Sequence, residues 1–145
     1  MGSNHEVVER FWSAFEEGDI DGAAELVEDD GVFIQPGMPE IRGREGLRQM
    51  LAGWRSAFPD LRHEVEEVVE SGDTVAVRLR VVGTHRGTLR MPDGREIEPT
   101  NQQVVWESVD WIKLRDGKVA SWRVYQDNVP FLTALGLLPE PATAG

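Results

Sequence analysis

The chain has 145 residues, carries a formal net charge of −11 and is 40% hydrophobic. This length suits one domain with its own core, and the acidic charge argues against nucleic-acid and anionic-membrane partners, which require a basic surface. The absence of cysteine excludes disulfides, thiolate metal sites and cysteine nucleophiles.

The targeting and domain signals are simple. No apolar run approaches the roughly 18 residues of a membrane span, and the polar N-terminal segment has no signal-peptide core. We therefore expect a cytoplasmic protein without a membrane partner. A single domain is expected over residues 1–138, and the composition of residues 139–145 is typical of a disordered C-terminal tail.

The first third of the chain has the pattern of three helices around one short strand. Ser3 followed by Glu6 is a capping-box pattern that opens the first helix. The apolar stripe of this helix consists of Val7, Val8, Phe11, Trp12 and Phe15. A second short helix follows with Asp19 or Asp21 as its N-cap, and a strand is expected over residues 31–35. The apolar face of a third helix consists of Leu47, Met50, Leu51, Trp54 and Phe58.

After Pro59 the pattern changes to the alternation of apolar and polar residues that is typical of strands. Strands are expected over residues 63–69 and 75–82, joined by a tight turn at residues 72–73. Residues 92–94, Pro-Asp-Gly, predict a further turn. This half of the chain therefore has the pattern of hairpins.

The last two predicted strands form the strongest hairpin signal. They cover residues 102–114 and 119–127, and residues 116–117, Asp-Gly, join them. A short helix is expected over residues 130–135. Three helices followed by an antiparallel meander predict an α+β fold. We expect a cone-shaped, curved antiparallel sheet, covered by the three N-terminal helices around an apolar pocket.

The sequence contains no phosphate-binding loop, no nucleophile elbow and no zinc motif. His5, His63 and His85 are scattered and lack the spacing of metal ligands. We therefore expect no metal and no cofactor. The chemistry that remains is acid–base catalysis by a carboxylate in an apolar pocket.

Asp127 is the first candidate for this carboxylate. It ends the last strand and shares a strand face with Tyr125, so aromatic surroundings would raise its pKa into a range that suits proton transfer. The alternative is a helix cap, because Asp127 directly precedes Asn128 and the final helix. The sequence leaves both interpretations open.

Asp110 is the second candidate. It lies on the neighbouring strand, where it could pair with Asp127 and divide the acid and base roles between two carboxylates. The favoured alternative is a salt bridge to Arg78, Arg80 or Arg123 on an exposed face of the sheet.

Polar and aromatic side chains complete the predicted site. Gln35 and His85 lie at strand ends, where they could bind a substrate oxygen or serve only the loops. The candidate pocket walls are Trp12, Trp54, Phe58, Trp106 and Tyr125. Each of these rings alone is more typical of a core, but in so small a domain we expect some of them to line a cavity. A small apolar ligand is therefore the expected partner.

Several short motifs occur together along nearly the whole chain. They are Phe58-Pro59-Asp60-Leu61-Arg62, Gly72-Asp73, Gly83-Thr84-His85-Arg86-Gly87, Asp116-Gly117-Lys118-Val119, Trp122 with Asp127, and Leu135-Gly136-Leu137-Leu138-Pro139. In this order they resemble the SnoaL-like polyketide cyclase and ester cyclase family of the nuclear-transport-factor-2-like superfamily. The resemblance implies the cone fold, metal-free and cofactor-free chemistry on a small apolar ligand, and homodimers that form through the sheet.

The resemblance also implies a role for Asp127, as the general acid–base of an intramolecular aldol closure. The cyclases that close anthracycline rings use a histidine on the preceding strand as well, and residues 109–113 of this chain contain none. The missing histidine leaves the aldol closure itself open. On the resemblance as a whole, the favoured function is a cyclisation or isomerisation of a small polyketide-like carbonyl compound.

Two other functions stay open. The last strand also resembles that of limonene-epoxide-hydrolase-like enzymes, which open an epoxide with an Asp–Arg–Asp relay. Asp110, Asp127 and either Arg78 or Arg80 supply these residue types, although the Arg-x-Asp arrangement is missing. The third possibility is a module that binds a small molecule or dimerises without catalysis, because one fold hosts many functions.

Overall fold

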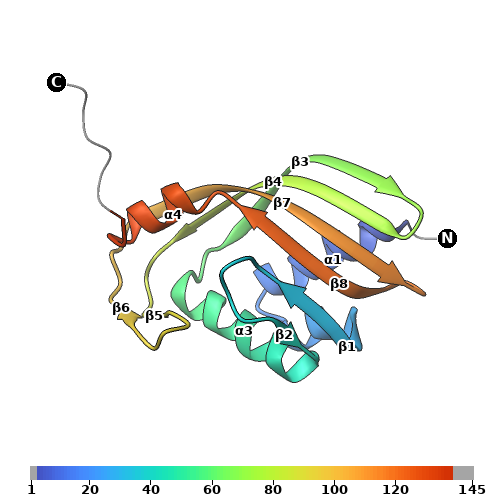
Figure 1. The fold of residues 1–145 in the computed structure, drawn as a ribbon, viewed down its shortest axis with the longest axis horizontal. Helices are drawn as coiled ribbons and strands as arrows, with labels where there is room; N and C mark the ends of the chain where they lie inside the picture. Colours follow the sequence, from blue (N-terminus) through green and yellow to red (C-terminus); the bar gives the residue numbers. More distant parts are fainter. Residues whose placement is uncertain (1–2, 139–145) are drawn as a thin grey trace.

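A strongly curved sheet with helices against its concave face forms the body of the protein (Figure 1). The computed structural model describes residues 3–138, so the predicted tail over residues 139–145 lies outside the described part. The helices are α1 (Asn4–Glu16), α2 (Ile20–Glu25), α3 (Arg44–Ala57) and α4 (Asn128–Ala134). The strands are β1 (Val27–Ile34), β2 (Ile41–Arg42), β3 (Arg62–Ser71), β4 (Thr74–Thr84), β5 (Leu89–Arg90), β6 (Glu96–Ile97), β7 (Gln103–Arg115) and β8 (Lys118–Gln126).

The main sheet has the strand order β2-β1-β8-β7-β4-β3. The meander from β3 to β8 is antiparallel, and its last turn has positive φ angles at both Asp116 (51°) and Gly117 (75°). These angles match the tight hairpin turn that Asp-Gly predicts. The α+β class, the curved sheet and the three N-terminal helices are therefore confirmed.

The prediction of a wholly antiparallel sheet is wrong at one place. β1 pairs with β8 in parallel, with Phe33 opposite Trp122, so the sheet is mixed. Residue alternation shows that a segment is a strand but carries no information on the direction of its partner. This pairing brings the N-terminal strand beside the C-terminal one and closes one wall of the cone.

The helix starts agree only in part with the predicted caps. Ser3 occupies the N-cap position of α1, but its side chain makes no capping hydrogen bond, so the predicted capping box with Glu6 does not form. Asp19 does cap α2, because its Oδ1 accepts a hydrogen bond of 2.9 Å from the Gly22 amide.

The core lies between α1, α3 and the concave face of the sheet. Strand β7 illustrates its construction, because its residues alternate between buried and exposed along almost the whole strand. Its buried positions are Val104, Trp106, Ser108, Asp110, Ile112 and Leu114. Two polar side chains therefore lie on an otherwise apolar face. No helix in residues 3–138 is long and apolar enough to cross a membrane.

Candidate active site

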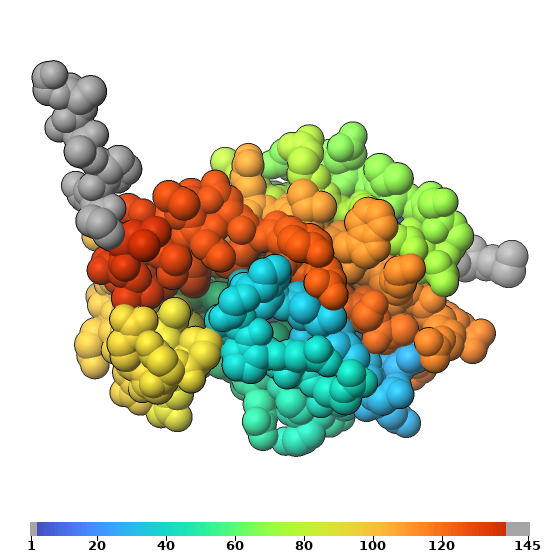
Figure 2. Space-filling view, in the orientation of Figure 1, coloured from blue at the N-terminus to red at the C-terminus, as the bar shows by residue number. Residues whose placement is uncertain are grey.

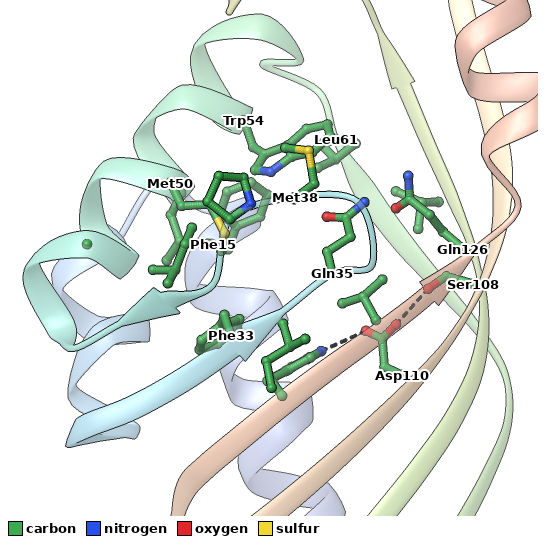
Figure 3. A pocket seen from close by; sticks show the side chains of 18 of the residues that line it. Phe15, Phe33, Gln35, Met38, Met50, Trp54, Leu61, Ser108, Asp110 and Gln126 are labelled. Atoms are coloured by element: carbon green, nitrogen blue, oxygen red, sulfur yellow. Dashed lines mark hydrogen bonds between the residues drawn. The ribbon is translucent and has the colours of Figure 1, made fainter. Parts of the chain in front are cut away.

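A cavity of about 790 Å³ lies between the helices and the concave face of the sheet. Its apolar lining includes Phe11, Trp12, Phe15, Phe33, Met50, Trp54, Leu61, Trp106, Trp122 and Val124 (Figure 3). A second hollow of residues 35–38, 88–91 and the start of α4 adjoins it. Figure 2 shows this recess between the β1–β2 connection (cyan), the β5–β6 hairpin (yellow) and α4 (red). The cavity thus has an apolar interior and an open mouth.

Asp110 is the buried carboxylate of this cavity, whereas Glu40 lines it from an exposed position. The Asp110 side chain projects from β7 into the lining, and the residue is only 5% exposed. Oδ1 accepts a 2.6 Å hydrogen bond from the Ser108 hydroxyl, and Oδ2 accepts one of 2.9 Å from the Trp122 indole N–H (Figure 3). Both carboxyl oxygens therefore have fixed partners, which set the orientation of the group.

Burial raises the pKa of Asp110 above its ordinary value. The hydrogen bonds from Ser108 and Trp122 and the charge of His63 act in the opposite direction, but they do not outweigh the loss of solvation. A carboxyl group of this kind retains its proton to a higher pH than an exposed one. Such a group is suited to acid–base catalysis.

The structure bears out neither predicted partner of Asp110. The pair with Asp127 does not form, because Asp127 does not line the cavity. The favoured alternative, a salt bridge on an exposed face, is also wrong, because Arg78 and Arg80 lie on the opposite, convex face. Arg78 donates to Glu66 at 2.6 Å and Arg80 to Glu64 at 3.0 Å. The predicted wall residues Trp12, Trp54 and Trp106 and the predicted polar contact Gln35 do line the cavity together with Asp110.

Asp127, by contrast, lies outside the cavity. It is exposed, and its Oδ1 accepts a 3.1 Å hydrogen bond from the Val129 amide at the start of α4. The helix-cap interpretation is therefore correct, and the expected place of Asp127 inside the pocket is wrong. Asp127 has the parity of Tyr125, and the face of β8 that carries Tyr125 is the convex one, whereas Trp122, Val124 and Gln126 line the cavity. The strand also ends at Gln126, one residue before Asp127.

Three further predicted site residues also lie elsewhere. Tyr125 is 50% exposed on the convex face, because alternation along β8 places it opposite to Val124. Phe58 is fully buried in the core. His85 is also fully buried, with its ring centroid 5.4 Å from that of Phe58 at a tilt of 30° and its Nδ1 accepting from the Thr100 amide at 3.2 Å. Burial lowers the pKa of His85.

The burial of His85 has a clear cause in the backbone. The amide groups of Arg86 and Gly87 both donate to the Ala57 carbonyl at the end of α3, at 3.0 and 3.1 Å. These bonds hold residues 85–87 against the end of α3, and a Cβ atom on Gly87 would lie 2.1 Å from the Ser56 carbonyl oxygen. His85 therefore points into the core instead of lying at the mouth of the cone.

Sequence reasoning missed three residues at the site: His63, Ser108 and Trp122. Ser108 and Asp110 have the same parity as the apolar residues of β7, so a polar pair on a buried strand face was the available signal. Nothing comparable distinguishes His63, which depends on the neighbouring helix for its position. Within residues 3–138 no group of three or more histidine and carboxylate side chains is placed to hold a metal ion.

The comparisons with known proteins agree on the family. A family model described as SnoaL-like polyketide cyclase matches residues 5–135. A search of curated protein sequences gave no match.

Solved structures with this fold are numerous. A protein from Jannaschia sp. CCS1, provisionally named a SnoaL-like polyketide cyclase, is 27% identical, with a TM-score of 0.81 over 94% of this chain and 93% of that chain. AclR from Streptomyces galilaeus, provisionally named a hydroxylase, is 28% identical, with a TM-score of 0.79 over 94% and 87%. A Catenulispora acidiphila protein with a ketosteroid isomerase-like fold is 16% identical, with a TM-score of 0.75 over 92% and 94%, and shows the fold alone.

Proposed function

Because this chain belongs to the SnoaL-like polyketide cyclase family, we propose that it catalyses an acid–base cyclisation or isomerisation of a small, apolar carbonyl compound. Asp110 is the catalytic acid–base in this proposal, in place of Asp127. The observation that carries it is a buried carboxyl group with two fixed hydrogen bonds in a cavity of aromatic side chains.

The proposed chemistry follows from the environment of Asp110. In its protonated form the group donates its proton to a carbonyl oxygen of the substrate, and the resulting carboxylate accepts the proton that the neighbouring carbon loses. The product is an enol and a carboxyl group that is protonated again. When the enol carbon attacks a second carbonyl of the same molecule, Asp110 donates its proton to the new alkoxide and takes up the enol proton. Asp110 is only 5% exposed among these apolar walls, so a bound substrate would be the group with which it exchanges protons.

The alternatives receive less support from the geometry. An epoxide-opening relay needs Asp110, an arginine and Asp127 side by side, whereas Asp127 caps α4 and both arginines of β4 lie on the convex face. A binding module without catalysis would not need a carboxyl group with a raised pKa in its cavity. The names of the similar proteins include both cyclase and hydroxylase, so they leave the reaction open.

The test uses β-tetralone, an apolar bicyclic ketone whose protons beside the carbonyl exchange through the enol. Proton NMR in heavy water follows this exchange with purified protein and no added metal or cofactor. We expect exchange above the buffer rate, and a loss of about 10²- to 10⁴-fold in the Asp110→Asn variant. Asparagine has the same shape and can keep both hydrogen bonds, with the Ser108 hydroxyl then accepting.

Asp127→Asn is the matched control and should exchange β-tetralone at the wild-type rate. Binding of β-naphthol, a stable mimic of the enol, separates catalysis from simple binding. A wild-type protein that binds β-naphthol but does not accelerate exchange would favour the binding module. Equal exchange by the wild type and Asp110→Asn would refute the role of Asp110.

A further inference from the structure

His63 is the only histidine in residues 3–138 that lines the large cavity. It lies on β3, at the concave face, and its side chain is 14% exposed. The structure shows two kinds of contact to its ring, one electrostatic and one aromatic, and both fix the ring in place.

Glu16, the last residue of α1, makes the electrostatic contact. Its Oε1 accepts a 2.6 Å hydrogen bond from the His63 backbone N–H and lies 3.2 Å from the ring Nδ1. Burial acts to raise the pKa of Glu16, but the hydrogen bonds and charge of His63 outweigh it and lower the pKa. Glu16 is therefore an ionised acceptor, which places the ring hydrogen on Nδ1. The other ring nitrogen, Nε2, then carries a free lone pair in the neutral ring.

Aromatic side chains make the second contact. Trp12 stacks on the His63 ring at 5.3 Å with an interplanar angle of 18°, and Phe15 meets it edge-on at 6.0 Å. No group in residues 3–138 forms a hydrogen bond with His63 Nε2, and this atom is not buried. The ring is thus held at one edge and on its faces, while its second nitrogen stays available.

His63 also acts on Asp110. The two residues project from the same concave face, on strands β3 and β7, which are separated by β4. The positive charge of a protonated His63 lowers the pKa of Asp110, so the two groups are electrostatically coupled. Trp12, which stacks on His63, also contacts Trp122, the hydrogen-bond donor to Asp110, at 5.6 Å.

We propose that His63 is the second catalytic residue of the cavity, the base that removes a proton from carbon, and that Glu16 is its positioning residue. This inference rests on the proposed function, in which Asp110 serves the carbonyl oxygen. Two groups with separate tasks remove the need for one carboxyl group to be acid and base at once.

The proton balance of the step is complete. The lone pair of His63 Nε2 takes a proton from the carbon beside the carbonyl, and the electrons of that C–H bond form the C=C bond of the enol. The carbonyl π electrons take the proton of Asp110. When the enol carbon attacks a second carbonyl of the same molecule, the enol proton returns to Asp110. The imidazolium of His63 protonates the new alkoxide, which restores both residues.

A purely structural role for the pair is the competing explanation, because the Glu16 bond also joins α1 to β3. Two variants separate the explanations. His63→Gln removes the base, and Glu16→Gln keeps an oxygen acceptor for the His63 amide while removing the charge. The matched controls are His5→Gln, which removes a surface histidine beside Glu70, and Glu17→Gln at the exposed end of α1.

The first readout is the rate of β-tetralone exchange. We expect His63→Gln to lose about 10²- to 10⁴-fold, because this variant removes the base. Glu16→Gln should show a smaller loss, because His63 is still present but its ring has lost the anionic partner that orients it. Both controls should keep the wild-type rate.

The second readout does not depend on turnover. Long-range proton–nitrogen correlation spectra identify which ring nitrogen of His63 carries the hydrogen. We expect the Nδ1–H form in the wild type, a shift of the Nε2 signal when β-naphthol binds, and a loss of the single tautomer in Glu16→Gln. An Nε2–H tautomer, an unchanged Nε2 signal with β-naphthol bound, or wild-type exchange by a folded His63→Gln variant would overturn the proposal. Failure of Asp110→Asn to lose activity would instead refute the proposed function.

Discussion

The two faces of the β7–β8 hairpin carry similar residue types in opposite environments. On the concave face Asp110 is 5% exposed and Trp122 is 2% exposed, and the two are joined by a hydrogen bond. On the convex face Trp111 is 48% exposed and Tyr125 is 50% exposed, with Arg123 paired opposite Trp111. Asp110 and Trp111 are consecutive in the sequence, so a single residue step separates a cavity wall from an open surface.

This difference shows that the face, more than the residue type, decides the chemistry of a side chain here. The carboxyl group on the concave face loses its solvation and meets two fixed donors. Asp127, at the end of the same hairpin, stays solvated and caps a helix.

The largest effect is expected on the convex face, where Val109, Trp111 and Tyr125 form an exposed apolar group. We expect this face to bury itself against a second copy of the chain. Trp111→Lys would then place a charge in the interface beside Arg123 and weaken the dimer by roughly 3 kcal/mol or more. Sedimentation equilibrium measures this change. A wild-type chain that is monomeric at high concentration would contradict the expectation.

The next effect concerns the indole donor to Asp110. Trp122→Phe keeps most of the aromatic packing but removes the N–H that bonds the carboxyl group. Removing this donor leaves a buried carboxyl oxygen without a partner, which costs about 1–3 kcal/mol, so the free energy of unfolding should fall by about this amount. Urea unfolding gives the value. Trp111→Phe is the control on the opposite face, and a loss of equal size there would contradict the comparison.

The third effect is a pH dependence of stability that comes from Asp110. Because burial raises its pKa, the folded chain holds this proton over a range of pH in which the unfolded chain has lost it. Stability is therefore fully present below the unfolded pKa and falls as the pH rises through the folded pKa, by about 1.4 kcal/mol for each unit of difference. Asp110→Asn removes this slope, so its stability relative to the wild type should increase with pH. Unfolding curves at several pH values would contradict this if the difference stayed constant.

The smallest effect is expected at Asp127. Asp127→Ala removes the cap of α4 and should lower the free energy of unfolding by about 1 kcal/mol, whereas Asp127→Asn should change it by a few tenths at most. Neither variant should alter β-tetralone exchange. A large loss of exchange in Asp127→Asn, with the free energy of unfolding unchanged, would show instead that Asp127 is needed for catalysis.

The sequence by itself determined the elements and the class of the fold. Period-two alternation in β4 and β7, the Asp-Gly turn at residues 116–117 and the helical stripe of α1 are local patterns, and each reflects the geometry of a single segment. The same local logic found Asp110 as a candidate and named Asp127 as a possible helix cap. It also found the aromatic residues Trp12, Trp54 and Trp106, which line the cavity.

Only the tertiary structure decided which face of each strand encloses the cavity. The parallel pairing of β1 with β8 involves segments about ninety residues apart, and no local pattern encodes it. The same is true of the contact between Glu16 and His63, which lie 47 positions apart. Burial of Asp110 and exposure of Asp127 depend on the curvature of the sheet and on where β8 ends. The pKa of a carboxyl group follows its solvation, and solvation is a property of the assembled fold.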